Sequence, residues 1–182
     1  MPARISPACV PRALHGKEAE FESAMPKYTT ERRVRHSAKE MFDLVADVES
    51  YPRFVPLCER LVVRGRAKDE GRDIIVADMT IAYGLIRETF TSRVILDRPA
   101  LKIAAAYLEG PFRHLDNRWT FRPVSDKASM VQFAIDYEFR SRTLGALMGA
   151  VFDRAFRKFA DAFEARADEV YRKTPEAVAA KA

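Results

Sequence analysis

The C-terminal part of the chain carries its longest regular pattern of hydrophobic positions. Across residues 143–172, apolar side chains recur at steps of three and four residues, which predicts one apolar stripe on an α-helix. About thirty residues at ~1.5 Å each give a helix of about 45 Å, long for a globular protein. Such a stripe needs a large apolar partner. Its members are Leu144, Leu147, Met148, Val151, Phe152, Ala155, Phe156, Phe159, Phe163, Val170 and Tyr171.

Alternating apolar and polar residues predict seven β-strands ahead of this helix, at 27–35, 59–68, 72–83, 85–96, 101–107, 112–122 and 131–139. Short turns join most of them, which favours antiparallel neighbours. The inward faces are almost wholly apolar. In the third strand we expect the core to receive Ile75, Ala77, Met79, Ile81 and Tyr83.

Two short helices are predicted between the first and second strands. Ser37 and Glu40 have the spacing of a capping box, so a helix should begin at Ala38 and continue to Ala46. Pro52 and Pro56 prevent one continuous helix after that, and the apolar residues around them predict a short helix and loop packed inward. The order of elements therefore predicts an α+β fold of the helix-grip type, in which a curved antiparallel sheet wraps round the long C-terminal helix.

Composition places the chain among single-domain globular proteins. It has 182 residues, 48% of them hydrophobic, and a formal net charge of +5. We expect a domain at 25–172, with disordered tails at 1–24 and 173–182, and Met25 is a plausible translation start. No apolar run approaches the ~20 residues of a membrane-spanning helix. Two cysteines without a motif favour a reducing, cytoplasmic compartment.

The sequence offers little for catalysis. His15, His36 and His114 have no nucleophile or carboxylate at a spacing that suggests a relay. Cysteine and histidine spacings typical of metal sites are missing, and so are glycine-rich phosphate loops. Asp78 and Glu88 are the only strand-interior acids in apolar surroundings. We therefore expect no enzymatic activity, no metal and no catalytic cofactor.

What the sequence does have is an excess of inward-facing aromatic residues. They could simply fill a core, or they could line a cavity between a concave sheet and the helix. Gly145, Ala146, Gly149 and Ala150 would either admit a close strand or leave volume for a ligand. Asn117 and several tyrosines could add polar atoms to an apolar pocket. The candidate lining residues are Phe42, Tyr51, Pro52, Phe54, Val55, Pro56, Met79, Ile81, Tyr83, Phe90, Tyr107, Phe112, Leu115, Asn117, Trp119, Phe133, Ile135, Tyr137, Leu144, Met148, Phe152 and Phe156.

Two short motifs resemble the coenzyme Q-binding START-like family, within the polyketide cyclase/dehydrase and lipid-transport superfamily. The first is Tyr-Pro-Arg-Phe-Val-Pro at 51–56, and the second is Gly-Pro-Phe at 110–112, followed by Leu115 and Trp119. The resemblance covers residues 25–172. Leu57 stands where the family commonly has tryptophan. The resemblance implies a helix-grip cavity that binds ubiquinone without catalysis, and its bacterial members include ribosome association toxins.

Three hypotheses follow. The first is a carrier or chaperone of a polyprenyl quinone that supports respiration, with respiratory complexes or an anionic membrane surface as partners. Arg60, Arg64, Arg66 and Lys68 could hold it peripherally at the inner face of the respiratory membrane. The second is a toxin that binds the large ribosomal subunit and blocks subunit joining, with which the positive charge is compatible. The third is a small-molecule cyclase or dehydratase, for which no acid–base pair is evident.

Overall fold

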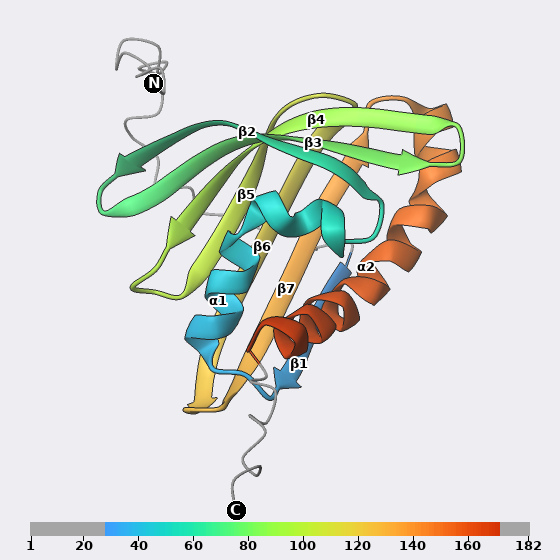
Figure 1. The fold of residues 1–182 in the computed structure, drawn as a ribbon. Helices are drawn as coiled ribbons and strands as arrows, with labels where there is room; N and C mark the ends of the chain where they lie inside the picture. Colours follow the sequence, from blue (N-terminus) through green and yellow to red (C-terminus); the bar gives the residue numbers. More distant parts are fainter. Residues whose placement is uncertain (1–27, 172–182) are drawn as a thin grey trace, which may run out of the picture.

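The computed structural model describes residues 28–171. The predicted tails and Met25 lie outside these residues. The elements, in order, are β1 (Tyr28–Val34), α1 (Ala38–Ala46), the 3-10 helix η2 (Val48–Arg53), β2 (Cys58–Asp69), β3 (Arg72–Tyr83), β4 (Ile86–Asp97), β5 (Lys102–Glu109), β6 (Phe112–Ser125), β7 (Ala128–Phe139) and α2 (Arg142–Tyr171). Figure 1 shows the curved sheet and the long helix that it holds. The predicted helix-grip fold is confirmed.

The seven strands form one antiparallel sheet in the order β1-β7-β6-β5-β4-β3-β2. β1 reaches the far edge because α1 and η2 carry the chain across the fold, whereas β2 to β7 follow one another as hairpins. Tyr83 departs from the prediction. It lies at the tip of the β3–β4 hairpin and is 49% exposed, because no other element of the described chain covers that tip.

The two short helices form as predicted. The Ser37 hydroxyl accepts a hydrogen bond from the Glu40 backbone N–H at 3.2 Å, and the Glu40 carboxylate accepts one from the Ser37 backbone N–H at 2.8 Å. In η2, the Tyr51 hydroxyl donates to the backbone oxygen of Val45 at 2.6 Å. This bond ties η2 to the end of α1, so that the loop after it turns inward over the sheet.

The long helix α2 begins at Arg142 and rests mainly on β1, β7 and α1. Its buried residues are Met148, Phe152, Ala155, Phe156, Phe163 and Ala167. Two members of the predicted apolar stripe instead face solvent: Leu147 is 60% exposed and Val170 is 47% exposed. Leu147 lies in the first turns of the helix, where the sheet no longer covers it. Among the described residues, no helix is long and apolar enough to cross a membrane.

Candidate functional site: an apolar cavity between sheet and helix

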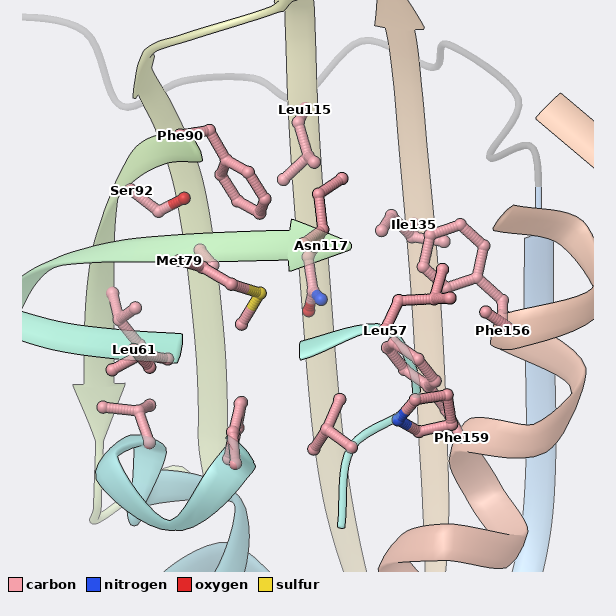
Figure 2. Close-up of a pocket in the computed structure, with 18 of the residues that line it drawn as sticks. Leu57, Leu61, Met79, Phe90, Ser92, Leu115, Asn117, Ile135, Phe156 and Phe159 are labelled. Carbon is pink, nitrogen blue, oxygen red and sulfur yellow. The ribbon is translucent and has the colours of Figure 1, made fainter. Parts of the chain in front are cut away.

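A cavity of about 110 Å³ lies between the concave face of the sheet and α2. Figure 2 shows side chains from β2, β3, β4, β6, β7 and α2 converging on it, with Met79 on one side and Leu57 next to Phe156 and Phe159 on the other. Its lining is almost entirely apolar. The lining residues are Val48, Tyr51, Val55, Pro56, Leu57, Leu61, Ala77, Met79, Ile81, Phe90, Ser92, Val94, Ile103, Ala105, Leu115, Asn117, Trp119, Ile135, Phe152, Ala155, Phe156, Phe159 and Phe163.

Small side chains at the centre of the sheet create this space. Ala77 pairs with Ser92 across β3 and β4, and Ala105 on β5 pairs with Asn117 on β6. All four face the helix and line the cavity. Larger residues surround this patch along the same strands, including Met79, Phe90 and Trp119. These larger side chains hold α2 away from the sheet, so the helix cannot come close enough to fill the space next to the small ones.

Two polar atoms in the cavity have no hydrogen-bond partner within residues 28–171. The Ser92 Oγ and the Asn117 Oδ1 are both buried, and neither is bonded to any residue that the structure describes. The Tyr51 hydroxyl, another polar group of the lining, is already satisfied by its bond to Val45. Its burial raises the pKa of the Tyr51 phenol, so it remains neutral. An unpartnered buried polar atom costs free energy, so a ligand group that meets it gains affinity.

The structure places just over half of the candidate lining residues around the cavity. Those that line it are Tyr51, Val55, Pro56, Met79, Ile81, Phe90, Leu115, Asn117, Trp119, Ile135, Phe152 and Phe156. Those that do not are Phe42, Pro52, Phe54, Tyr83, Tyr107, Phe112, Phe133, Tyr137, Leu144 and Met148. Pro52 and Tyr83 are exposed, and the rest of the second group packs within or beside the core.

Aromatic packing explains most of these displaced residues. Phe112 stacks on Phe139 with ring centroids 4.7 Å apart, and Phe133 lies 4.5 Å from the Trp119 ring. Tyr137 is buried and its hydroxyl donates to Asp153 of α2 at 3.2 Å. Burial and the neighbouring Asp153 carboxylate raise the pKa of Tyr137. These rings fill the space under α2 on the β6–β7 side and leave the cavity on the β3–β5 side.

Sequence reasoning missed the small residues and several flanking ones. The missed lining residues are Val48, Leu57, Leu61, Ala77, Ser92, Val94, Ile103, Ala105, Ala155, Phe159 and Phe163. The signal for the cavity was an alanine or serine at the inward phase of three successive strands. The helix glycines do not line it: a Cβ at Gly145 would meet only Phe139, and one at Gly149 would meet nothing within 4 Å.

The cavity lining includes no carboxylate and no histidine. Asp78 lies on the other face of β3, where it accepts hydrogen bonds from Arg64 at 2.6 Å and Thr91 at 2.8 Å. Burial raises the pKa of this carboxyl, but these two bonds outweigh it and the pKa is lowered. His36 lies 2.8 Å from Asp168, and His114 lies 3.0 Å from Asp136. In the described part of the chain, no group of histidines, cysteines and carboxylates could hold a metal.

Comparison with known proteins agrees with this arrangement. The family model described as polyketide cyclase / dehydrase and lipid transport matches residues 34–164. The chain belongs to this family. The resemblance to the START-like superfamily is confirmed at this level, and a START superfamily protein of Mycobacterium smegmatis has the same fold, with a TM-score of 0.66 and 20% identity over 79% of this chain and 97% of its own.

Among curated relatives, the ribosome association toxin RatA of Escherichia coli is 33% identical over 83% of this chain and 92% of its own length. The persistence and stress-resistance toxin PasT, also from Escherichia coli, matches to the same extent. The mitochondrial coenzyme Q-binding protein of Drosophila melanogaster is 29% identical over 79% of this chain and 59% of its own length.

Among solved structures, an 18 kDa protein of Caulobacter crescentus is 33% identical, with a TM-score of 0.66 over 79% of this chain and 97% of its own. A Streptomyces aromatase/cyclase also has a TM-score of 0.66, over 80% and 94% of the two chains, but is only 19% identical. The second likeness shows the fold alone.

Proposed function

We propose that this protein binds the ring of a polyprenyl quinone in the cavity and holds it without catalysing a reaction. One observation carries the proposal: an apolar cavity contains two unpartnered polar atoms, on Ser92 and Asn117. A ligand suited to it has an apolar body and few hydrogen-bonding groups. A quinone ring with its hydrocarbon tail has this chemistry.

The two polar side chains also suit the two redox forms of such a ring. The Ser92 hydroxyl can donate to a quinone carbonyl, and the Asn117 amide offers both an acceptor oxygen and a donor NH₂. Ser92 pairs with Tyr107 of β5, and Asn117 pairs with Ala105 of the same strand. Two strand spacings and an offset of two residues along the strands put the backbones of Ser92 and Asn117 about 12 Å apart. A ring with oxygens at opposite positions, each about 2.8 Å from a protein group, is comparable in span.

The size of the cavity limits what it holds in this conformation. At about 110 Å³ it is below the roughly 300–1,000 Å³ of pockets that enclose drug-sized ligands. In this conformation the cavity has room for only part of a quinone ring. The cavity must widen before it can hold a whole ring and the start of the hydrocarbon tail. The loop bearing Leu57 and the helix face bearing Phe159 meet over the cavity in Figure 2, so we expect their separation to provide that room.

The direct test is quinone retention. Protein is purified from a quinone-containing host and then incubated with ubiquinone in detergent. Native mass spectrometry of the intact protein measures how much ligand is bound, and organic extraction of a second sample identifies that ligand. We expect quinone at up to one per chain, and less in a Ser92→Ala/Asn117→Leu variant. Ser125→Ala, an exposed serine at the end of β6, is the control. A protein that stays empty after incubation overturns the proposal.

A second candidate function is association with the ribosome. The comparisons favour it over the quinone proposal, because the toxin relatives match over nearly their whole length and the coenzyme Q-binding relative over only 59% of its own. Under this proposal the protein binds the large subunit and blocks subunit joining in the cytoplasm. The basic strand β2 is a weak candidate surface, since Arg64, Arg66 and Lys68 pair with Asp78, Glu49 and Asp73.

Cosedimentation with purified large subunits at low and high salt tests this second function. Binding that weakens steeply as salt rises would support it, because phosphate contacts release counterions. Absence of cosedimentation at low salt would remove it. Quinone retention and cosedimentation are measured independently, so a positive result in one test does not exclude a positive result in the other.

A further inference from the structure

Exposed apolar side chains gather at one end of the molecule. Of the large hydrophobic residues that the structure shows exposed, four belong to this group: Tyr83 at 49%, Leu85 fully exposed, Leu108 at 52% and Leu147 at 60%. Tyr83 and Leu85 flank Gly84 in the β3–β4 turn. Leu108 is near the end of β5, and Leu147 is in the second turn of α2. We call these four residues the apolar tip.

The sheet register places these segments at the same end of the sheet. Phe112, just after the β5–β6 turn, pairs with Phe139, just before α2, and the Arg140 backbone N–H donates to Pro111 at 2.9 Å. The start of α2 therefore lies beside the β5–β6 turn. Thr91 pairs with Glu109 at the end of β5, so the β3–β4 hairpin projects about 16 Å beyond it. Figure 1 shows both turns and the start of α2 in its upper right part.

Two basic residues follow Leu147 of the apolar tip along α2, toward the C-terminal end of the helix. Leu147, Arg154 and Lys158 are spaced by seven and four residues, which puts them along one exposed face of the helix. Along the helix axis, Arg154 lies about 10 Å from Leu147 toward the C-terminus, and Lys158 lies about 16 Å from it in the same direction. Neither of these cations has an ion pair with any residue in the described range 28–171. Their charge is therefore available to an anionic partner.

We propose that the apolar tip docks on an anionic lipid bilayer, with Leu85 and Leu147 entering the interface and Arg154 and Lys158 reaching the headgroups. Apolar side chains in front and basic ones behind are the arrangement of interfacial membrane contacts. The tip is built from separate turns, which suits a deformable lipid surface better than the flat, closely packed patch of a protein interface. Nucleic-acid binding would instead favour several exposed aromatic rings among the bases, and Tyr83 is the one in the tip.

This docking surface goes beyond the proposed quinone site and does not depend on what fills the cavity. None of Leu85, Leu108, Leu147, Arg154 and Lys158 lines the cavity. Variants of the tip therefore leave quinone retention in detergent as a separate measurement. Failure of the docking proposal and failure of the quinone proposal can be told apart in the same set of proteins.

The test is flotation of the full chain with vesicles of phosphatidylcholine alone or mixed with phosphatidylglycerol. We expect the protein to float with the anionic vesicles. Leu85→Asp/Leu147→Asp should lower the partition coefficient about tenfold or more, and Arg154→Glu/Lys158→Glu should remove the preference for phosphatidylglycerol. Val124→Asp is the matched control, because Val124 is 50% exposed at the opposite end of the sheet, beside the β6–β7 turn.

Two results would overturn the docking proposal. One is a wild-type protein that floats with neither kind of vesicle at low salt. The other is an equal loss of flotation in the Val124→Asp control and the tip variants. If Arg154→Glu/Lys158→Glu instead weakens cosedimentation with ribosomal subunits while vesicles are never bound, the basic face belongs to an RNA contact and the lipid assignment is wrong.

Discussion

Ser92 and Asn117 face the same apolar cavity from strands on either side of β5, and within the described chain neither the Ser92 Oγ nor the Asn117 Oδ1 has a hydrogen-bond partner. On β5, Ala105 pairs with Asn117 and lies diagonally next to Ser92, and its small side chain leaves space in the cavity. A fold that needed only stability would fill this place with apolar side chains. The arrangement is explained if a ligand satisfies the two atoms.

Replacing Ser92 with alanine should therefore affect stability and binding in opposite directions. Removing a buried hydroxyl that has no partner should raise the free energy of unfolding of the empty protein by up to about 1 kcal/mol. The same change should weaken quinone binding about five- to tenfold through loss of one hydrogen bond. Urea denaturation and quinone titration measure the two quantities. Loss of stability in the empty protein would mean that the hydroxyl has a structural partner.

Filling the cavity should abolish binding while the fold survives. Ala105→Leu adds three carbon atoms to a space of about 110 Å³, so we expect the free energy of unfolding to change by less than about 1.5 kcal/mol and quinone retention to be lost. The control is Ala104→Leu, on the exposed face of the same strand. Equal quinone retention in the two variants would place the ligand elsewhere.

Most of the fold could be predicted from the sequence because its patterns are local. Strict alternation marks β7, and the Ser37–Glu40 pair marks the start of α1. Leu147 and Tyr83 were misplaced because their patterns continue past the point where the partner element ends. A periodic pattern tells which face a side chain is on, but it does not tell where the opposing layer stops.

The cavity was harder to predict because it depends on which side chains are absent from the centre of the sheet. Large inward aromatics drew attention, yet Phe112 and Tyr137 pack against other rings and leave no space. Ala77, Ser92 and Ala105 are individually unremarkable in the sequence. Only the strand register shows that Ala77 and Ser92 pair across β3 and β4, and that Ala105 on β5 lies diagonally next to Ser92, opposite Val94.

The glycine of the Gly-Pro-Phe motif has a steric role next to the cavity. Gly110 has a φ of +133°, and a Cβ there would lie 2.7 Å from the Cβ of Phe90 and 2.9 Å from the Thr89 oxygen. Gly110→Ala should lower the free energy of unfolding by about 3 kcal/mol or more and displace Phe90 from the cavity wall. Gly84→Ala, with a φ of +59° but open space around it, should cost only about 1–2 kcal/mol. Urea denaturation compares them, and equal losses would rule out the contact with Phe90 as the cause.

The final prediction concerns Cys58, a buried thiol at the start of β2, next to the cavity residue Leu57. Burial raises the pKa of the Cys58 thiol from 9.0 to about 11. The unfolded chain therefore releases this proton at a lower pH than the folded protein does. Its contribution to stability is complete below pH 9 and is lost between pH 9 and about pH 11.

The free energy of unfolding should accordingly fall by about 2 kcal/mol across that range because of this one group. Cys58→Ala should fall less steeply, whatever its stability at neutral pH, and both proteins should carry Cys9→Ala so that a single thiol titrates. Burial also raises the pKa of Tyr51, which adds a loss of the same sign at higher pH in both proteins. Urea denaturation from neutral pH to pH 11 measures the difference in slope. Parallel curves for the two proteins would mean that the Cys58 thiol ionises in the folded state as readily as in the unfolded chain.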